Sequence, residues 1–372
     1  MIGETSAAFL SEVSSSKAVR TIMYTEPGYD ETVWRRIVDE MAWTGAHVPE
    51  ELGGLGLGFV ELVIILEQMG ASLLCSPFFS SVCLAQNAFL VAGSESQRST
   101  YLKRLVQGEI GTLAFMGLGN QWNSNAVSAS YKRKANSFVL EGDYRYVTDG
   151  HIADLFVVAA RNVEKNGLSL FAIDARASGV SREWRPTLDQ TRRQATIRLR
   201  DVNVSPDRLI GGLGEAAPIL DVILDLAAIC VAADQVGGAQ RSLDLAVEFS
   251  LDRKQFGRQI GSFQAIKHKA ADMMLKVEAA RSALYYAACV ADQVFANEAD
   301  ADSLREAASV AKSFCSDAYF FVAGNAMQIH GGVGFTEEYD IQLFLKRAKS
   351  TETFLGSAIW HRERLAKMIL DE

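Results

Sequence analysis

The chain has 372 residues, 49% of them hydrophobic, which suffices for two or three domains with a large core. A net charge of −8 argues against nucleic acid as the main partner, because a phosphate backbone binds a basic surface. The five cysteines have no metal-ligand spacing and lie mostly in apolar stretches. We therefore expect buried free thiols, no metal site and a reducing, cytoplasmic location.

Neither a signal peptide nor a membrane span is expected. Residues 1–16 lack the basic and apolar regions of a signal peptide. No run of about eighteen apolar residues occurs, which is the length needed to cross a bilayer.

Residues 1–111 are predicted to form a helical domain. Val33, Trp34 and Ile37 recur at helical spacing. The glycine-rich segment 47–58 is similar to a dinucleotide-binding loop, but helices rather than a strand precede it, so the Rossmann context is missing. The expected helices cover residues 32–41, 59–74, 80–91 and 94–105.

From residue 112 to 213 the hydrophobic period changes from helical to alternating, which predicts a β domain, a barrel or sandwich, inserted between two helical domains. Residues 214–372 contain one proline, Pro218, and long alanine-rich stretches that predict an antiparallel four-helix bundle. The fold class is therefore α+β. The expected strands are 129–132, 137–142, 144–148, 154–160, 168–173 and 195–199, and the expected helices are 219–251, 263–296, 301–330, 341–347 and 359–370.

Two bends between these helices are candidate binding segments. The segment 253–273 places Arg253, Lys254 and Arg258 close together, and arginine offers a fixed fork of donors to phosphate oxygens. The segment 328–335 contains three glycines, where no Cβ blocks the approach of a ligand to the backbone N–H groups. A solvated charge cluster and an ordinary helix-ending glycine turn are the alternatives.

Four spaced motifs in this order resemble the acyl-CoA dehydrogenase family over about residues 30–370. In particular, the chain resembles subunits of actinobacterial heterotetrameric enzymes that degrade steroid side chains. Each motif is weak alone, and their joint order makes the resemblance specific. The motifs are Pro-Glu-Glu-Leu-Gly-Gly-Leu-Gly at 49–56, Tyr-Val-Thr-Asp-Gly at 146–150, Arg-Lys-Gln-Phe-Gly at 253–257 with Gln264, and Gln-Ile-His-Gly-Gly-Val-Gly-Phe at 328–335.

The resemblance implies a dimer of dimers that binds FAD between subunits. Arg253 would contact the pyrophosphate. Tyr146 and Thr148 fall where a Trp-x-Thr segment packs on the isoalloxazine, and Tyr146 keeps the aromatic wall; Thr148 supplies a hydroxyl donor or is simply a strand threonine. The residues expected at the adenosine end are Phe256, Ile260 and Gln264, with Gln328, Gly331 and Gly332 holding the same end of a neighbouring subunit's flavin.

The same resemblance places a catalytic glutamate at one of two positions, and this sequence has it at neither. Acyl-CoA α,β-dehydrogenation needs a carboxylate in a dry site, within reach of the α-carbon. Leu355 stands at the usual position and Ala227 at the other. Glu352 is the leading replacement; Asp225, two residues from Ala227, should face away on its helix. For both acids the alternative is a structural role, as a solvated side chain or a helix cap.

A second departure lies in the segment 113–122, where the resemblance leads us to expect a threonine that bonds the flavin edge. Leu-Ala-Phe-Met-Gly-Leu-Gly-Asn-Gln-Trp lacks it. The residues expected at the adenosine half of the flavin site are therefore present. Those expected at the isoalloxazine ring and the base are partly missing.

Several functions remain open. The chain is an active FAD-dependent acyl-CoA dehydrogenase with a displaced base, or a non-catalytic subunit of an α2β2 enzyme whose partner supplies the base. A flavin oxidase or monooxygenase and a flavin-free scaffold on the same fold are further alternatives. The resemblance also implies an acyl-CoA substrate, an electron-acceptor flavoprotein and a role in fatty-acid or steroid side-chain β-oxidation. Ala227, Ala228 and Ala232 would admit a bulky acyl group or only let helices approach closely.

Overall fold

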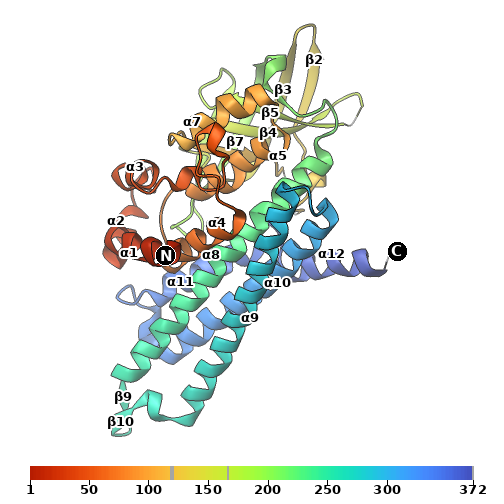
Figure 1. Ribbon diagram of the computed structural model, residues 1–372. Helices are drawn as coiled ribbons and strands as arrows, with labels where there is room; N and C mark the ends of the chain where they lie inside the picture. Colours follow the sequence, from red (N-terminus) through yellow and green to blue (C-terminus); the bar gives the residue numbers. More distant parts are fainter. Residues whose placement is uncertain (118–120, 166, 371–372) are drawn as a thin grey trace. The chain divides into compact units, whose positions relative to one another are not determined.

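A computed structural model describes residues 1–117, 121–165 and 167–370, and the chain divides into two compact units. We call them the β unit (Ile22–Gly58 and Cys75–Ala227) and the helical unit (Met1–Thr21, Phe59–Leu74 and Ala228–Glu372). The long helix α8 (Ala216–Asp252) begins in the β unit and ends in the helical unit. The α+β fold class predicted from the sequence is confirmed (Figure 1).

The β unit contains one sheet of eight strands within the described ranges, in the order β6-β7-β3-β2-β4-β5-β8, with β1 paired to β4 in parallel. Residues 155–160 of β4 are all buried, so this strand is a continuous apolar run rather than an alternating one. The strands are β1 (Gly111–Ala114), β2 (Ser130–Lys134), β3 (Ser137–Thr148), β4 (Leu155–Asn162), β5 (Leu168–Asp174), β6 (Val180–Arg185), β7 (Gln194–Val204) and β8 (Leu209–Ile210).

Strand β3 joins two strands that the sequence predicts separately. The register against β7 shifts between Leu140 and Gly142 and again between Tyr144 and Val147. Such bulges bend a strand and re-aim its side chains. At the second shift Tyr146 has a φ of +57° and its side chain is 50% exposed.

Short helices complete the β unit. The α3 helix starts after Asp30, whose carboxylate accepts hydrogen bonds from the backbone N–H groups of Thr32 and Val33. The helical elements are α3 (Glu31–Asp39), η1 (Trp43–Gly45), η2 (Glu50–Leu52), η3 (Phe79–Gln86), α5 (Asn87–Ala92), α6 (Glu95–Gln97), η4 (Arg98–Leu102), α7 (Lys103–Val106), η5 (Ser124–Ala126) and η6 (Pro206–Arg208).

The helical unit is built on α9 and α10, which run side by side (Figure 1). The predicted helix 301–330 is confirmed at both ends, whereas α11 continues beyond the predicted residue 347. The elements are α1 (Ile2–Val13), α2 (Ser16–Ile22), α4 (Phe59–Ala71), the rest of α8, β9 (Lys254–Gln255), β10 (Arg258–Gln259), η7 (Ile260–Ser262), α9 (Gln264–Phe295), α10 (Ala301–His330), η8 (Gly331–Phe335), α11 (Ile341–Thr353) and α12 (Ala358–Leu370).

Backbones approach closely where α4 crosses α8. A Cβ on Gly237 would lie 1.8 Å from the carbonyl oxygen of Glu67, and a Cβ on Gly70 would lie 2.2 Å from that of Asp234. Asp234 also pairs with Arg347 of α11 at 2.8 Å, and their side chains are only 3% and 1% exposed. The three helices are therefore fixed by close packing and by a buried ion pair.

Within the described ranges, α8 is the one helix long and apolar enough to cross a membrane, with a mean hydropathy of 2.1 over an 18-residue window. Since 72% of that window is buried in the protein, its burial is that of a core helix. Four of the five cysteines are buried free thiols as predicted, and Cys289 on α9 is the exposed exception.

Candidate active site

The basic bend between α8 and α9 is a β-hairpin (Figure 1). Its two turn residues, Phe256 and Gly257, have φ angles of +53° and +79°. Two successive positive φ values are typical of a tight hairpin turn, and they are strained for a phenylalanine. The Phe256 side chain is nevertheless 93% exposed. A large aromatic side chain held outward on a strained turn favours contact with another molecule.

Among the described residues, the cations of this hairpin have no acidic partners. Within the part of the chain that the structure describes, no carboxylate forms an ion pair with Arg253, Lys254 or Arg258. The guanidinium of Arg258 lies over the ring of Phe263, 4.1 Å from its centroid. Arg253 and Lys254 are exposed, so their donors face solvent and are available to an anion.

The glycine turn after α10 is open to a ligand at two of its three glycines. Gly331 has a φ of +63° with a ψ of −144°, a conformation that only glycine adopts readily. A Cβ on Gly331 or Gly332 would meet no atom within 4 Å, whereas one on Gly334 would lie 2.7 Å from Met327 Sδ. Gly334 therefore serves packing, while Gly331 and Gly332 leave their backbone accessible.

The two bends lie at the same end of the helical unit. His330, which directly precedes η8, stacks on Phe249 of α8 with ring centroids 4.4 Å apart. Phe249 is one helical turn before Arg253, whose backbone N–H donates to the Phe249 carbonyl at 2.9 Å. Burial lowers the pKa of His330, so its neutral ring is favoured in this stack. Of the remaining predicted residues, Ile260 is half-buried in η7, Gln264 is exposed at the start of α9, and Gln328 is exposed near the end of α10.

In the β unit, Thr148 is 1% exposed and its hydroxyl has no hydrogen-bond partner among the described residues. Its carbonyl accepts a hydrogen bond from the Thr112 hydroxyl at 2.7 Å. A buried hydroxyl without a partner costs free energy unless a ligand satisfies it. Of the predicted flavin-facing segment, Leu113 and Ala114 lie in β1, and residues 118–120 lie outside the described residues.

The loop that should carry the base is built around Leu355 instead. Leu355 is 3% exposed and has a φ of +58°. Its carbonyl oxygen lies 2.9 Å from His361 Nε2. The side-chain nitrogen of Lys312 donates to the carbonyl oxygens of Thr351 and Gly356 at 3.0 and 2.9 Å. The loop is thus held on several sides with an apolar residue at its centre.

Lys312 is fully buried, and this burial lowers its pKa to about 7. Burial also lowers the pKa of His361 well below its ordinary value. Neither residue was identified from the sequence. The signal available for Lys312 was a lysine among small and apolar residues of a helix, whereas His361 is followed by Arg-Glu-Arg and gave no such signal.

The other two acids near the base positions have different environments. Glu352 Oε2 pairs with Lys349 Nζ at 2.7 Å on α11, with 28% of its side chain exposed. Asp225 is 3% exposed in α8, and Ala227 is completely buried. The ion pair holds the Glu352 carboxylate toward Lys349. Glu352 stays a prediction as the displaced base.

Comparison with known proteins decides the family. The chain matches "Acyl-CoA dehydrogenase, N-terminal domain" over residues 1–109 and "Acyl-CoA dehydrogenase, C-terminal domain" over residues 219–370. It is 32% identical over 369 residues to the acyl-CoA dehydrogenase IpdE2 of Mycolicibacterium smegmatis, covering 99% of this chain and 96% of that one. The chain belongs to the acyl-CoA dehydrogenase family.

Solved structures agree. A variant of the steroid acyl-CoA dehydrogenase Tcur3481–Tcur3483 has a TM-score of 0.88 at 28% identity, covering 100% of this chain and 97% of that one. The ChsE4–ChsE5 complex of Mycobacterium tuberculosis has a TM-score of 0.89 at 26% identity, covering 100% and 96%. Acyl-CoA dehydrogenases are flavin-dependent oxidoreductases and generally bind FAD. The resemblance stated from the motifs is therefore confirmed at the level of the family and its enzyme class.

The residues present in this acyl-CoA dehydrogenase chain fit FAD. Arg253, which forms no ion pair among the described residues, suits a pyrophosphate, and the open backbone at Gly331 and Gly332 suits a close ligand. The Thr148 hydroxyl, which has no partner among the same residues, suits a polar ring edge. These three observations concern the adenosine end and one contact of the ring. They do not include a base.

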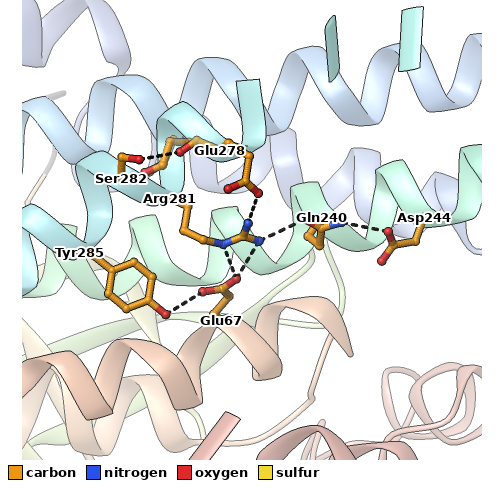
Figure 2. Close-up of polar contacts among 9 residues, drawn as sticks. Glu67, Gln240, Asp244, Glu278, Arg281, Ser282 and Tyr285 are labelled. Carbon is orange, nitrogen blue, oxygen red and sulfur yellow. Dashed lines mark hydrogen bonds and ion pairs between the residues drawn. The ribbon is translucent and has the colours of Figure 1, made fainter. Parts of the chain in front are cut away.

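A further buried carboxylate, that of Glu67 on α4, is hydrogen-bonded within a polar cluster (Figure 2). Arg281 of α9 donates to Glu67 Oε1 from Nε at 3.1 Å and also reaches it from Nη2 at 3.0 Å. The Tyr285 hydroxyl lies 3.5 Å from Oε2, and Arg281 also contacts Gln240 and Glu278. Because its carboxylate is held by the guanidinium of Arg281, Glu67 joins α4 to α9. Glu67 was not identified as a contact residue from the sequence, which predicts only a helix over 59–74.

Proposed function

We propose that this chain works in the FAD-dependent α,β-dehydrogenation of an acyl-CoA thioester, as a subunit of an α2β2 acyl-CoA dehydrogenase whose partner chain supplies the catalytic base. The observation that carries the proposal is Leu355, which is buried at the family's usual glutamate position in a loop held by Lys312 and His361. Because a buried leucine stands where the family usually has glutamate, this chain has no carboxylate base at that position.

Each residue of the proposed site has a role that follows from its chemistry. FAD, when bound, would supply the acceptor for the hydride that leaves the β-carbon. Arg253 binds the pyrophosphate through its fork of donors, and the backbone at Gly331 and Gly332 holds the adenosine end. The Thr148 hydroxyl donates to the edge of the flavin ring, and Tyr146 forms an aromatic wall beside it. Phe256, Ile260 and Gln264 line the adenosine side.

Exposed apolar side chains on the helical unit support assembly with a second chain. Exposed large apolar side chains are stabilised when a partner chain covers them. Proteins similar to this chain include the ChsE4–ChsE5 complex and a steroid acyl-CoA dehydrogenase. We infer a dimer of dimers, a bulky acyl-CoA substrate and a flavoprotein as electron acceptor. The exposed apolar residues include Phe256, Met274, Leu275, Tyr286, Phe314 and Phe335.

The second candidate function is an active enzyme that uses Glu352 as its own base. Glu352 lies at the end of α11, three residues before Leu355, which favours it over Asp225. Its ion pair with Lys349 would have to open before the carboxylate could accept a proton. A flavin oxidase or monooxygenase and a flavin-free scaffold remain as outcomes of the test.

The test is to purify the chain alone and after co-expression with a catalytic acyl-CoA dehydrogenase chain, and to measure flavin absorbance and acyl-CoA turnover. We expect turnover only in the mixed assembly, with flavin lost in Arg253→Ala. The exposed Lys132→Ala, on β2, is the matched control and should keep flavin. Stoichiometric FAD with turnover by the chain alone would favour the active enzyme. A function that survives Arg253→Ala without flavin would favour the scaffold.

A further inference from the structure

In the part of the chain that the structure describes, Lys269 of α9 hydrogen-bonds two side chains, both of them amides on α10. Its Nζ donates to Asn325 Oδ1 at 2.8 Å and to Gln328 Oε1 at 3.2 Å. Asn325 and Gln328 are three residues apart, so their side chains lie on the same face of the helix. One ammonium group therefore holds two neighbouring amides.

This contact fixes which end of each amide faces the lysine. An ammonium group only donates, so only an amide oxygen can face it. Asn325 uses its other end as well, because its Nδ2 donates to the Phe321 carbonyl at 2.9 Å. The NH2 group of Gln328 is therefore directed away from Lys269. Among the residues that the structure describes, no acceptor takes its hydrogens.

The charge of Lys269 is not compensated at this place. Within the described ranges, no carboxylate forms an ion pair with it, and both of its side-chain partners are neutral. An ammonium bonded only to amides keeps its positive potential, which strengthens the Gln328 donor and attracts an anion.

We propose that Lys269 is a positioning residue for the dinucleotide, because it holds the Gln328 amide with its NH2 group outward. Gln328 then recognises an acceptor atom on the adenosine diphosphate half of FAD, and the lysine adds a positive charge beside it. This inference rests on the proposed function and on the motif resemblance, which implies that Gln328 lies at the adenosine end.

Titration of flavin-free protein with FAD, in the assembly in which the wild type binds it, tests the inference through the dissociation constant. Lys269→Met should weaken binding roughly tenfold, the loss typical of one charge-assisted hydrogen bond. Lys269→Arg, which also only donates, should restore most of it. Lys267→Met is the control, because Lys267 is exposed two residues away and makes no side-chain hydrogen bond within the described residues.

Gln328→Glu decides the orientation of the amide. It replaces the outward donor by an acceptor, so binding should weaken at least as much as in Lys269→Met. Unchanged affinity for FAD in Gln328→Glu would mean that the amide oxygen of Gln328 faces the ligand. Unchanged affinity in Lys269→Met would mean that Lys269 does not position Gln328. Either result overturns the inference. Thermal unfolding of the flavin-free variants should match the wild type. Failure of the wild type to bind FAD in any assembly would instead contradict the proposed function, and the inference with it.

Discussion

The side-chain nitrogen of Lys312 donates a hydrogen bond to the carbonyl oxygen of Gly356, 2.9 Å away, from one helix into the loop that precedes another. The same nitrogen bonds the Thr351 carbonyl and the Ser316 hydroxyl. These contacts make one buried side chain the cap for the end of α11. The loop around Leu355 depends on it.

Lys312→Met should therefore destabilise the protein. The variant leaves buried carbonyl oxygens without donors, and the expected loss in the free energy of unfolding is about 2 kcal/mol or more. Chemical denaturation at neutral pH measures it. Lys346→Met is the control, because Lys346 is only half-buried on α11 and makes no side-chain hydrogen bond within the described part. Equal stability of the two variants would contradict the capping role.

The lowered pKa of Lys312 predicts a pH dependence. Burial lowers this pKa from 10.5 to about 7. Between these values the unfolded chain binds more protons at this site than the folded chain does, so stability rises with pH across that window. We expect the free energy of unfolding to rise more from pH 7 to pH 9.5 in the wild type than in Lys312→Met. Parallel profiles would show that Lys312 keeps its ordinary pKa in the fold.

A second pH effect arises in the β unit. His47 lies 2.9 Å from Asn87 Oδ1, and burial lowers its pKa from 6.5 to about 4. The unfolded chain therefore binds more protons between pH 4 and pH 6.5, so stability is lost as the pH falls through this window. Urea unfolding at pH 7 and pH 5 should show a smaller loss in His47→Gln than in the wild type. A loss of the same size in both would exclude His47 as the source.

Removing the Thr148 hydroxyl should affect protein stability and flavin affinity in different ways. Thr148→Val removes a buried hydroxyl that has no partner among the described residues, so the flavin-free protein should be as stable as the wild type or more stable. If this hydroxyl bonds the flavin edge, affinity for FAD should nevertheless fall, by roughly fivefold or more. The control is Thr112→Val, which loses a real hydrogen bond to the Thr148 carbonyl and should lower stability. Unchanged FAD affinity in Thr148→Val would mean that Thr148 is a structural strand residue with no role in flavin binding.

The pair Glu67–Arg281 should be a strong stabilising contact between α4 and α9. Removing one partner from a largely buried ion pair costs about 2 kcal/mol or more, since the other charge is left uncompensated. Glu67→Gln and Arg281→Met should each show this loss, and the double variant should lose less than their sum. The exposed pair Arg36–Glu40 is the comparison, where Arg36→Met should cost about 0.5 kcal/mol at most. Additive losses at Glu67 and Arg281 would mean that the two side chains do not interact.

Features with local signals were predictable from the sequence. Helix α10 begins after Asp300, whose side chain accepts from the backbone N–H of Ser303, and its last residue, His330, is followed by Gly331. An N-cap acid and a C-terminal glycine are readable signals, so the predicted and observed boundaries coincide. The long apolar runs of α8 and α9 were located within a few residues from their composition, although α9 has neither a capping side chain nor a C-terminal glycine.

Features that depend on packing between distant segments were not predictable. Strand β6 has exposed residues at nearly every position and shows no period, so it escaped notice. Glu67 and Arg281 are 214 residues apart in sequence, and no local pattern reports their contact. The bulge at Tyr146 depends on the register against β7, which the sequence of β3 alone does not contain.

The turn at Phe256 has a consequence for producing the protein. Its side chain is held outward in a strained backbone conformation, so the hairpin tip is already shaped for contact before any partner arrives. A preformed apolar tip lowers the conformational-entropy cost of assembly. It also makes an unassembled chain prone to non-specific association. Overproduced alone, this chain should aggregate, and a charged residue in place of Phe256 should keep it dispersed while removing its ability to assemble.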